Sequence, residues 1–218
     1  MIKAAIFDLD GTLADTMDDL RTAMNAMLRS FGWAQRSRDD LLRFINKGAY
    51  SFVKDALPDD IDKDEETVQK ALKTYSEFYT KCYDDKTYPY HGITDELIKL
   101  HAAGIKLGVL SNKQDRFVKV IMEKLFDAAL FSEIEGQLDL PAKPDPASAL
   151  RLADRMGVTA DECAFIGDSD ADMETAINAG MTPVAVSWGY RDADFLRKVG
   201  AKHVIGTPSE TASVILGL

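Results

Sequence analysis

The sequence has few cysteines and no long apolar run, and each absence excludes a class of protein. Cys82 and Cys163 are the two cysteines, and they lie too far apart for a zinc-ligand or redox pair, so we expect two reduced thiols. No apolar run approaches the roughly 18 residues that a membrane span needs. The first apolar stretch is short and meets Asp8 and Asp10, which argues against a signal peptide. These patterns predict a cytoplasmic protein without a membrane partner.

Positive charge is also scarce. The 218 residues include 26 Lys and Arg against 36 Asp and Glu, which gives a formal net charge of −10. Such an acidic chain disfavours nucleic acid as a partner. A small anionic substrate is still compatible with it, because a few local cations dominate a pocket. Hydrophobic residues make up 46% of the chain, as in a folded globular protein, and the length allows a core with a smaller inserted domain.

The apolar pattern separates a helical segment from an α/β region. Residues 4–7 form an apolar run typical of a buried strand, and residues 16–85 show only helical periodicity. Farther along, helices alternate with short strands, which we expect at 105–110, 129–131, 163–166, 183–186 and 203–205. This alternation predicts an α/β fold. Its Rossmann-like parallel-sheet core would comprise residues 1–15 and 86–218, with an inserted all-helical cap domain at 16–85.

Polar residues stand at or just beyond the carboxyl ends of the predicted strands, which meet at one edge of a parallel sheet. These residues are Asp8, Asp10, Ser111, Asn112, Lys143, Asp168 and Asp172. Taken singly, such residues usually cap helices or form turns. Together, the carboxylates would raise one another's pKa unless a cation were bound, and all-oxygen ligands suit Mg²⁺. A carboxylate nucleophile, a metal ion, a lysine and a hydroxyl predict a phosphoryl-transfer site.

The motifs resemble those of the haloacid dehalogenase superfamily across essentially the whole chain. They are DLDGT at 8–12, LSN at 110–112, KP at 143–144 and GDSDAD at 167–172, in the family's order. The helical segment between the first and second motifs also fits. Within the superfamily the sequence is most similar to the phosphoglycolate phosphatase group, through TLADT at 12–16 and Trp188-Gly189-Tyr190.

The resemblance implies a role for each carboxylate. Asp8 would attack phosphorus and form an aspartyl-phosphate, while Asp10 would protonate the leaving oxygen and then activate water. The Asp8 carboxylate, the Asp10 backbone carbonyl and Asp168 would bind Mg²⁺. Asp172 would assist, either directly or through water.

The resemblance also implies how the phosphoryl group is held. Ser111 and Lys143 would bind its oxygens, Asn112 would support their loop, and Thr12 would belong to the same substrate site. Pro144 favours an extended backbone at Lys143, which would aim that side chain.

Three further positions leave alternatives open. Lys113 is a rival phosphate-binding lysine, although we expect a surface lysine at the start of a helix. Lys47 and Gly48 break the helical pattern, and this break is either a loop that touches the substrate's leaving group or an ordinary interhelical turn. His91 lies where the chain returns to the core, and we expect a structural role for it.

The leading functional prediction is a Mg²⁺-dependent phosphatase for a small phosphorylated metabolite, with 2-phosphoglycolate as the favoured substrate. A β-phosphoglucomutase-like phosphomutase, a nucleotide monophosphatase and a pyrophosphatase are alternatives. Dehalogenase and phosphonate-hydrolase chemistry does not need an acid at Asp10 and is disfavoured. A non-catalytic binding protein is disfavoured because neither Lys143 nor any expected carboxylate is missing. The sequence leaves open whether the chain is a monomer or a homodimer.

Overall fold

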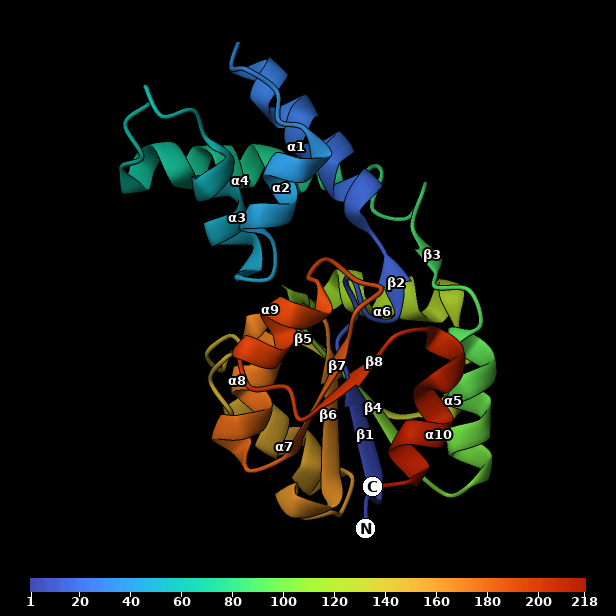
Figure 1. Ribbon diagram of the computed structural model, residues 1–218. Helices are drawn as coiled ribbons and strands as arrows, with labels where there is room; N and C mark the ends of the chain where they lie inside the picture. Colours follow the sequence, from blue (N-terminus) through green and yellow to red (C-terminus); the bar gives the residue numbers. More distant parts are fainter. The chain divides into compact units, whose positions relative to one another are not determined.

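In the computed structural model, which describes residues 1–218, the chain forms two units (Figure 1). Met1–Asp15 and Pro89–Leu218 form the first unit, and Thr16–Tyr88 form the second. The second unit therefore interrupts the first in sequence. Short strands β2 (Ala14–Asp15) and β3 (Tyr88–Pro89) pair where the chain leaves and rejoins the first unit.

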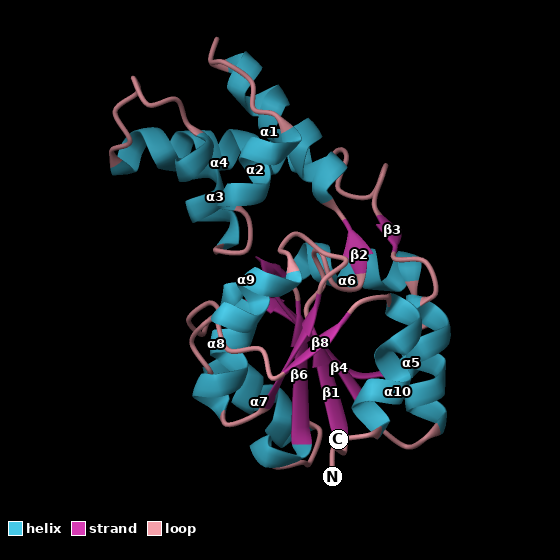
Figure 2. Ribbon diagram, in the orientation of Figure 1, coloured by secondary structure: helices cyan, strands magenta, loops and turns pink.

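A six-stranded parallel sheet forms the centre of the first unit, as the sequence predicted (Figure 2). The strand order is β5-β4-β1-β6-β7-β8, so the first strand in sequence lies inside the sheet. Both β1 and β6 are fully buried, which explains their uninterrupted apolar sequences. The strands are β1 (Ala4–Phe7), β4 (Lys106–Gln114), β5 (Phe131–Gln137), β6 (Cys163–Gly167), β7 (Thr182–Val186) and β8 (His203–Ile205).

Helices cover the sheet on both faces. Figure 2 shows α5 and α10 on one side of the strands and α7 and α8 on the other. Ile6 and Phe165, which are register partners in β1 and β6, pack in one buried cluster with Leu152 and Met156. The helices of this unit are α5 (Ile93–Ala102), α6 (Asp115–Leu125), α7 (Ala147–Arg155), α8 (Asp170–Ala179), α9 (Ala193–Lys198) and α10 (Thr211–Leu216).

One strand prediction was wrong. Residues 128–130 form a short 3₁₀ helix, which Asp127 begins by accepting a hydrogen bond from the Ala129 N–H. Strand β5 follows it and contains Glu135. A charged residue at this position interrupts the apolar pattern by which a buried strand is predicted. Glu135 is nonetheless buried, because Arg151 and Arg155 donate to its carboxylate at 2.6 and 3.0 Å.

The second unit is helical, as expected. Its helices are α1 (Met17–Ser30), α2 (Arg38–Phe44), α3 (Gly48–Ala56) and α4 (Glu65–Tyr79). The buried carboxylate of Asp19 in α1 accepts hydrogen bonds from the Lys86 N–H and the Thr87 hydroxyl, which fixes the returning chain against α1. No helix in either unit has the length and apolar character that a membrane crossing requires.

Candidate active site

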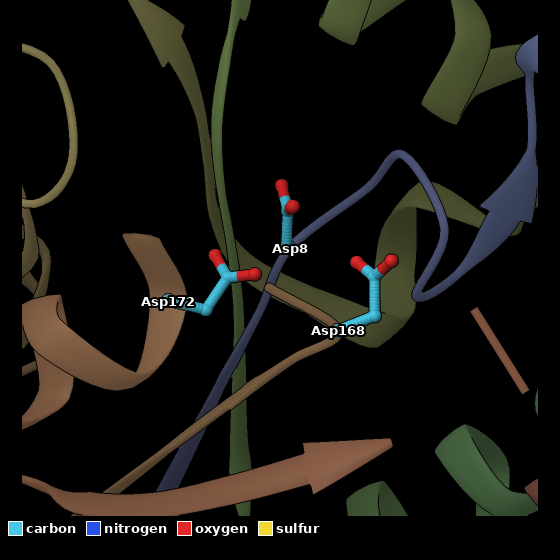
Figure 3. Close-up of side chains that lie close together, drawn as sticks. All are labelled: Asp8, Asp168 and Asp172. Carbon is cyan, nitrogen blue, oxygen red and sulfur yellow. The ribbon is translucent and has the colours of Figure 1, made fainter. Parts of the chain in front are cut away.

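Three buried carboxylates lie together at the carboxyl ends of β1 and β6. Phe7 of β1 is the register partner of Ile166 in β6, so Asp8 and Asp168 leave neighbouring strands side by side. Asp172 joins them from the first turn of α8. One oxygen of each carboxylate lies within 4.8 Å of the others. Figure 3 shows the three groups projecting to the same side of the strand ends.

Lys143 places a buried positive charge between two of these carboxylates. Its Nζ lies 2.9 Å from Asp8 Oδ1 and 2.7 Å from Asp172 Oδ1, and it also donates to the Leu110 carbonyl at 3.1 Å. Only 3% of the side chain is exposed. The Lys143–Pro144 peptide bond is cis. The predicted lysine is therefore brought to the predicted aspartates.

The strand end that carries Ser111 and Asn112 lies beside Lys143. The side-chain amide of Asn112 forms two hydrogen bonds with the Lys143 backbone. It accepts from the Lys143 N–H and donates to the Lys143 carbonyl. Ser111 is buried, and its hydroxyl oxygen accepts from the Lys113 N–H at 3.3 Å. The second and third motifs are thus joined directly.

Asp168 is held by contacts that the sequence did not reveal. The Tyr190 N–H donates to Asp168 Oδ2 at 2.7 Å, and the Thr12 hydroxyl donates to Oδ1 at 3.1 Å. Thr12 is fully buried, and its hydroxyl supports this carboxylate; its contact with a substrate stays a prediction. The Trp188 indole N–H donates to the Thr12 carbonyl. The sequence signal was the Trp188-Gly189-Tyr190 motif, but nothing in it pointed to a backbone donor.

Two glycines allow this close packing. Gly11 has a φ of +84°, and a Cβ there would lie 2.3 Å from Asp168 Oδ2. A Cβ at Gly189 would lie 2.3 Å from the Gly11 carbonyl oxygen. Both positions therefore require glycine for steric reasons.

Asp172 begins α8 as part of a capping box. Its Oδ2 accepts from the N–H and the hydroxyl of Ser169, while the Ser169 hydroxyl accepts from the Asp172 N–H. This box starts the helix at Asp170. It also fixes the orientation of the carboxylate that faces Lys143.

Asp10 forms an ion pair with the Lys113 ammonium, and both side chains are largely buried, at 11% and 6% exposure. The prediction of a surface lysine at a helix start was wrong. Strand β4 continues past Leu110 to Gln114, so Ser111 and Lys113 stand two residues apart in extended chain and face the same way. Two buried lysines thus contact the predicted carboxylates, Lys143 at Asp8 and Asp172 and Lys113 at Asp10.

Burial controls the electrostatics of this cluster. It raises the pKa of Asp8 to about 7, with further increases from Asp172 and Asp10 and an opposing effect from Lys143. The pKa of Asp168 is raised well above its ordinary value by burial and then by Asp172 and Asp8. For Lys143, burial alone would lower the pKa, but the charges of Asp172 and Asp8 outweigh it and raise the pKa.

The charge of the cluster fits a divalent cation. Counted as ionised, these three carboxylates and the Lys143 ammonium have a formal charge of −2, and burial of Asp8 and Asp168 raises the pKa of both carboxyl groups. Closely spaced carboxylate oxygens are the donors that Mg²⁺ prefers. The residues able to hold such an ion are therefore Asp8, Asp168 and Asp172.

The remaining candidates belong to other segments of the chain. Lys47 and Gly48 belong to the second unit, where Lys47 precedes α3 and Gly48 begins it with a φ of +79°. Their contact with a substrate stays a prediction. His91 is exposed, in the turn before α5, and His101 lies in α5.

Comparison with known proteins adds a second line of evidence. Residues 5–186 match the model of a family described as haloacid dehalogenase-like hydrolase. The chain is 35% identical over 200 residues to the phosphoglycolate phosphatase of Psychrobacter arcticus, which covers 89% of this chain and 87% of that protein. It is 30% identical over 217 residues to the phosphoglycolate phosphatase of Nitrosospira multiformis, with 98% and 96% covered.

A solved structure is similar along the whole chain. The protein comes from Lactobacillus delbrueckii subsp. bulgaricus and is provisionally named a phosphoglycolate phosphatase. It superposes with a TM-score of 0.92 at 32% identity, and 99% of each chain is covered.

Proposed function

The chain is an enzyme of the haloacid dehalogenase-like hydrolase family, as its four motifs predicted, and we propose that it is a Mg²⁺-dependent phosphatase acting on a small phosphorylated metabolite. The observation that carries the proposal is the environment of Asp8. Its carboxylate is buried at the end of an interior strand, 2.9 Å from Lys143 Nζ and within 4.8 Å of two further carboxylates. A carboxylate nucleophile with a fixed cation beside it suits attack on a phosphate ester.

The proposed reaction has two steps at phosphorus. An Asp8 oxygen forms a bond to phosphorus as the bond to the substrate's leaving oxygen breaks, and Asp10 gives that oxygen a proton. Asp10 then takes a proton from water, whose oxygen attacks phosphorus. The bond to Asp8 breaks, which releases inorganic phosphate and regenerates the carboxylate. Ser111 and Lys143 hold the phosphoryl oxygens throughout.

The same cluster is proposed to bind the metal. Asp8, Asp168 and Asp172 would hold it together with the Asp10 carbonyl, and the −2 charge of the site supports a divalent ion. Bound Mg²⁺ would neutralise and orient the phosphoryl oxygens. The backbone contacts to Asp168 and the capping box at Asp172 fix those two ligands in advance.

The favoured substrate is 2-phosphoglycolate. The support is the name shared by the relatives from P. arcticus and N. multiformis, which this chain matches over most of their length. We assign substrate selection to the helical unit, with Lys47 and Gly48 as the contacts to test. Lys47→Ala should change affinity or the order of preferred substrates, and an unchanged profile would remove it from the substrate site.

A substrate panel tests the activity. Purified protein is assayed for phosphate release from 2-phosphoglycolate, sugar phosphates, nucleoside monophosphates and pyrophosphate, with MgCl₂ and with excess EDTA. We expect Mg²⁺-dependent release, with the highest kcat/KM for 2-phosphoglycolate. Absence of Mg²⁺-dependent release from every compound would refute the phosphatase. Isomerisation of glucose 1-phosphate to glucose 6-phosphate would instead identify a phosphomutase.

A trapping experiment tests the covalent step. Enzyme mixed with ³²P-labelled substrate is quenched in acid, and protein-bound label is counted. The wild type should retain label, and Asp10→Asn should change its rate of formation and loss. Asp8→Asn should remain folded, bind no label and lose turnover. Label on Asp8→Asn would place the nucleophile elsewhere.

A further inference from the structure

Lys113 is one of two lysines whose side chains are buried in ion pairs. Its side chain is 6% exposed and that of Lys143 is 3% exposed, whereas Lys119, which pairs with Asp115 at 2.7 Å, is 59% exposed. Removing an ammonium group from water is costly, and a buried ion pair seldom adds net stability over apolar residues of the same size. The Lys113–Asp10 pair therefore points to a role other than stabilising the fold.

The backbone of Lys113 lies close to strand β5. Its N–H donates to the Ser111 hydroxyl oxygen at 3.3 Å, and its carbonyl oxygen lies where a Cβ on Gly136 would approach to 2.6 Å. The Gly136 N–H in β5 also donates to Asp115 Oδ1 at 3.0 Å. The base of the lysine side chain therefore lies in a strand that pairs with β5, while its ammonium contacts Asp10.

The two buried lysines form ion pairs with different carboxylates. Lys143 contacts Asp8 and Asp172, and Lys113 contacts Asp10. Asp10 follows Asp8 in a loop, and the terminal torsion of an aspartate has only a broad preference of its own. An ion pair with a fixed ammonium restricts that torsion.

We propose that Lys113 is the positioning residue for Asp10, holding its carboxyl group in the orientation from which the protonated form gives a proton to the substrate's leaving oxygen. The inference rests on the proposed acid–base role of Asp10. Proton transfer to the leaving oxygen matters most when the leaving group is a poor one. Loss of Lys113 should therefore slow the reaction most for substrates with poor leaving groups.

Leaving-group dependence tests the inference. Wild type, Lys113→Met, Lys113→Arg and Asp10→Asn are compared on p-nitrophenyl phosphate, whose leaving group needs no proton, and on phosphate esters of alcohols. For the alkyl esters Lys113→Met should lower the rate of phosphoenzyme formation at saturating substrate by about 10²-fold or more, as expected for loss of general acid catalysis. Acid-quenched single-turnover trapping measures this rate apart from the later hydrolysis, in which Asp10 acts on an intermediate common to all substrates. For p-nitrophenyl phosphate the same rate should fall far less. Lys113→Arg, which keeps the charge, should recover most of the loss.

Lys119→Met is the matched control, because it removes a surface lysine from an ion pair in the same unit, and it should behave as wild type. Equal slowing of phosphoenzyme formation from all substrates by Lys113→Met would overturn the inference. So would an effect confined to KM for substrates that carry a second anionic group. If Lys113→Met does not fold, Lys113→Gln is subject to the same criteria.

The experiment also separates the inference from the proposed function. A changed leaving-group dependence in Asp10→Asn, without one in the Lys113 variants, overturns the positioning role alone. A wild-type dependence in Asp10→Asn overturns the acid role of Asp10, and the inference falls with it.

Discussion

The side chain of Asn112 and the backbone of Lys143 are hydrogen-bonded in both directions. Asn112 Oδ1 accepts from the Lys143 N–H at 2.8 Å, and Asn112 Nδ2 donates to the Lys143 carbonyl at 3.0 Å. The two residues are far apart in sequence, so this pair is what fixes the lysine loop against the end of β4. Its geometry determines where the Lys143 ammonium meets Asp8.

Asn112→Ala should show how much activity depends on the position of the Lys143 side chain, because its charge is unchanged in this variant. Both hydrogen bonds are lost while the ammonium remains, and a displacement of about 1 Å can lower activity by about 10²-fold. We expect such a decrease in kcat/KM, together with about 1–3 kcal/mol of lost stability from unpaired buried backbone groups. Steady-state kinetics and denaturant unfolding measure the two effects.

Asn178→Ala is the control for that variant. Asn178 is exposed and donates to the carbonyl of Pro144, so it contacts the same loop from its surface side. This variant should retain nearly full activity. Equal losses in the two variants would contradict a specific role for the pair with Asn112.

The parts of the site that the sequence predicted are those that follow directly from a strand end. Asp8 and Asp168 follow buried apolar runs, and parallel pairing of β1 with β6 brings them together. Lys143 comes shortly after the third predicted strand and lies beyond the end of β5 at Gln137, and the order of the motifs also supported its assignment. These residues were predictable because side-chain type and strand position carry the information.

Other contacts depend on tertiary pairing and were missed. Lys113 reaches Asp10 because β4 extends to Gln114, which pairs with Gln137 of β5 after a shift in register. Tyr190 supports Asp168 through its backbone N–H, which its side-chain type does not indicate. Glu135 is charged and yet buried in a strand, because α7 supplies two arginines. No local pattern in the sequence indicates any of these three contacts.

Gly11→Ala and Gly104→Ala form a matched pair of backbone variants. Both glycines have a φ of +84°, but a Cβ at Gly104 meets nothing within 4 Å, whereas one at Gly11 meets Asp168. Each substitution should therefore cost about 1–2 kcal/mol from left-handed backbone strain. Only Gly11→Ala should also weaken Mg²⁺ binding and kcat/KM. Calorimetric Mg²⁺ titration checks this difference, and similar Mg²⁺ affinity in both variants would contradict it.

The GDSDAD motif contains three aspartates, and the structure distinguishes between two that are close in sequence. Asp172 is fully buried and contacts Lys143, whereas Asp170 is partly exposed at the first position of α8. Asp172→Asn should weaken Mg²⁺ binding by about 10–100-fold, as expected for loss of a metal-site carboxylate. It should also lower the pKa of Asp8 and Asp168, because Asp172 raises both. Asp170→Asn should change neither property, and Mg²⁺ titration with carboxyl ¹³C NMR tests both variants.

The raised pKa of Asp8 predicts an unusual dependence of stability on pH. Its folded-state pKa is about 7, against 3.8 for the unfolded chain, so between about pH 4 and 7 the folded protein binds more protons than the unfolded chain does. Without metal, the free energy of unfolding should therefore fall as the pH rises through this window. Asp168 should contribute in the same direction, because its pKa is also raised.

Mg²⁺ should reverse that trend, because it binds the ionised carboxylates and binds more tightly as they lose protons. At pH 8, Mg²⁺ at about 100 times its Kd should add about 2.7 kcal/mol, or about 5–10 °C in Tm for a chain of this size. At pH 5 the increase in Tm should be much smaller. Thermal unfolding between pH 5 and 8, in EDTA and in MgCl₂ at matched ionic strength, measures both trends. Asp8→Asn is the control, since its stability in EDTA should depend less on pH than that of the wild type. A Tm in EDTA that rises steadily from pH 5 to 8, or a larger Mg²⁺ effect at pH 5, would contradict a carboxylate cluster that needs the cation to ionise.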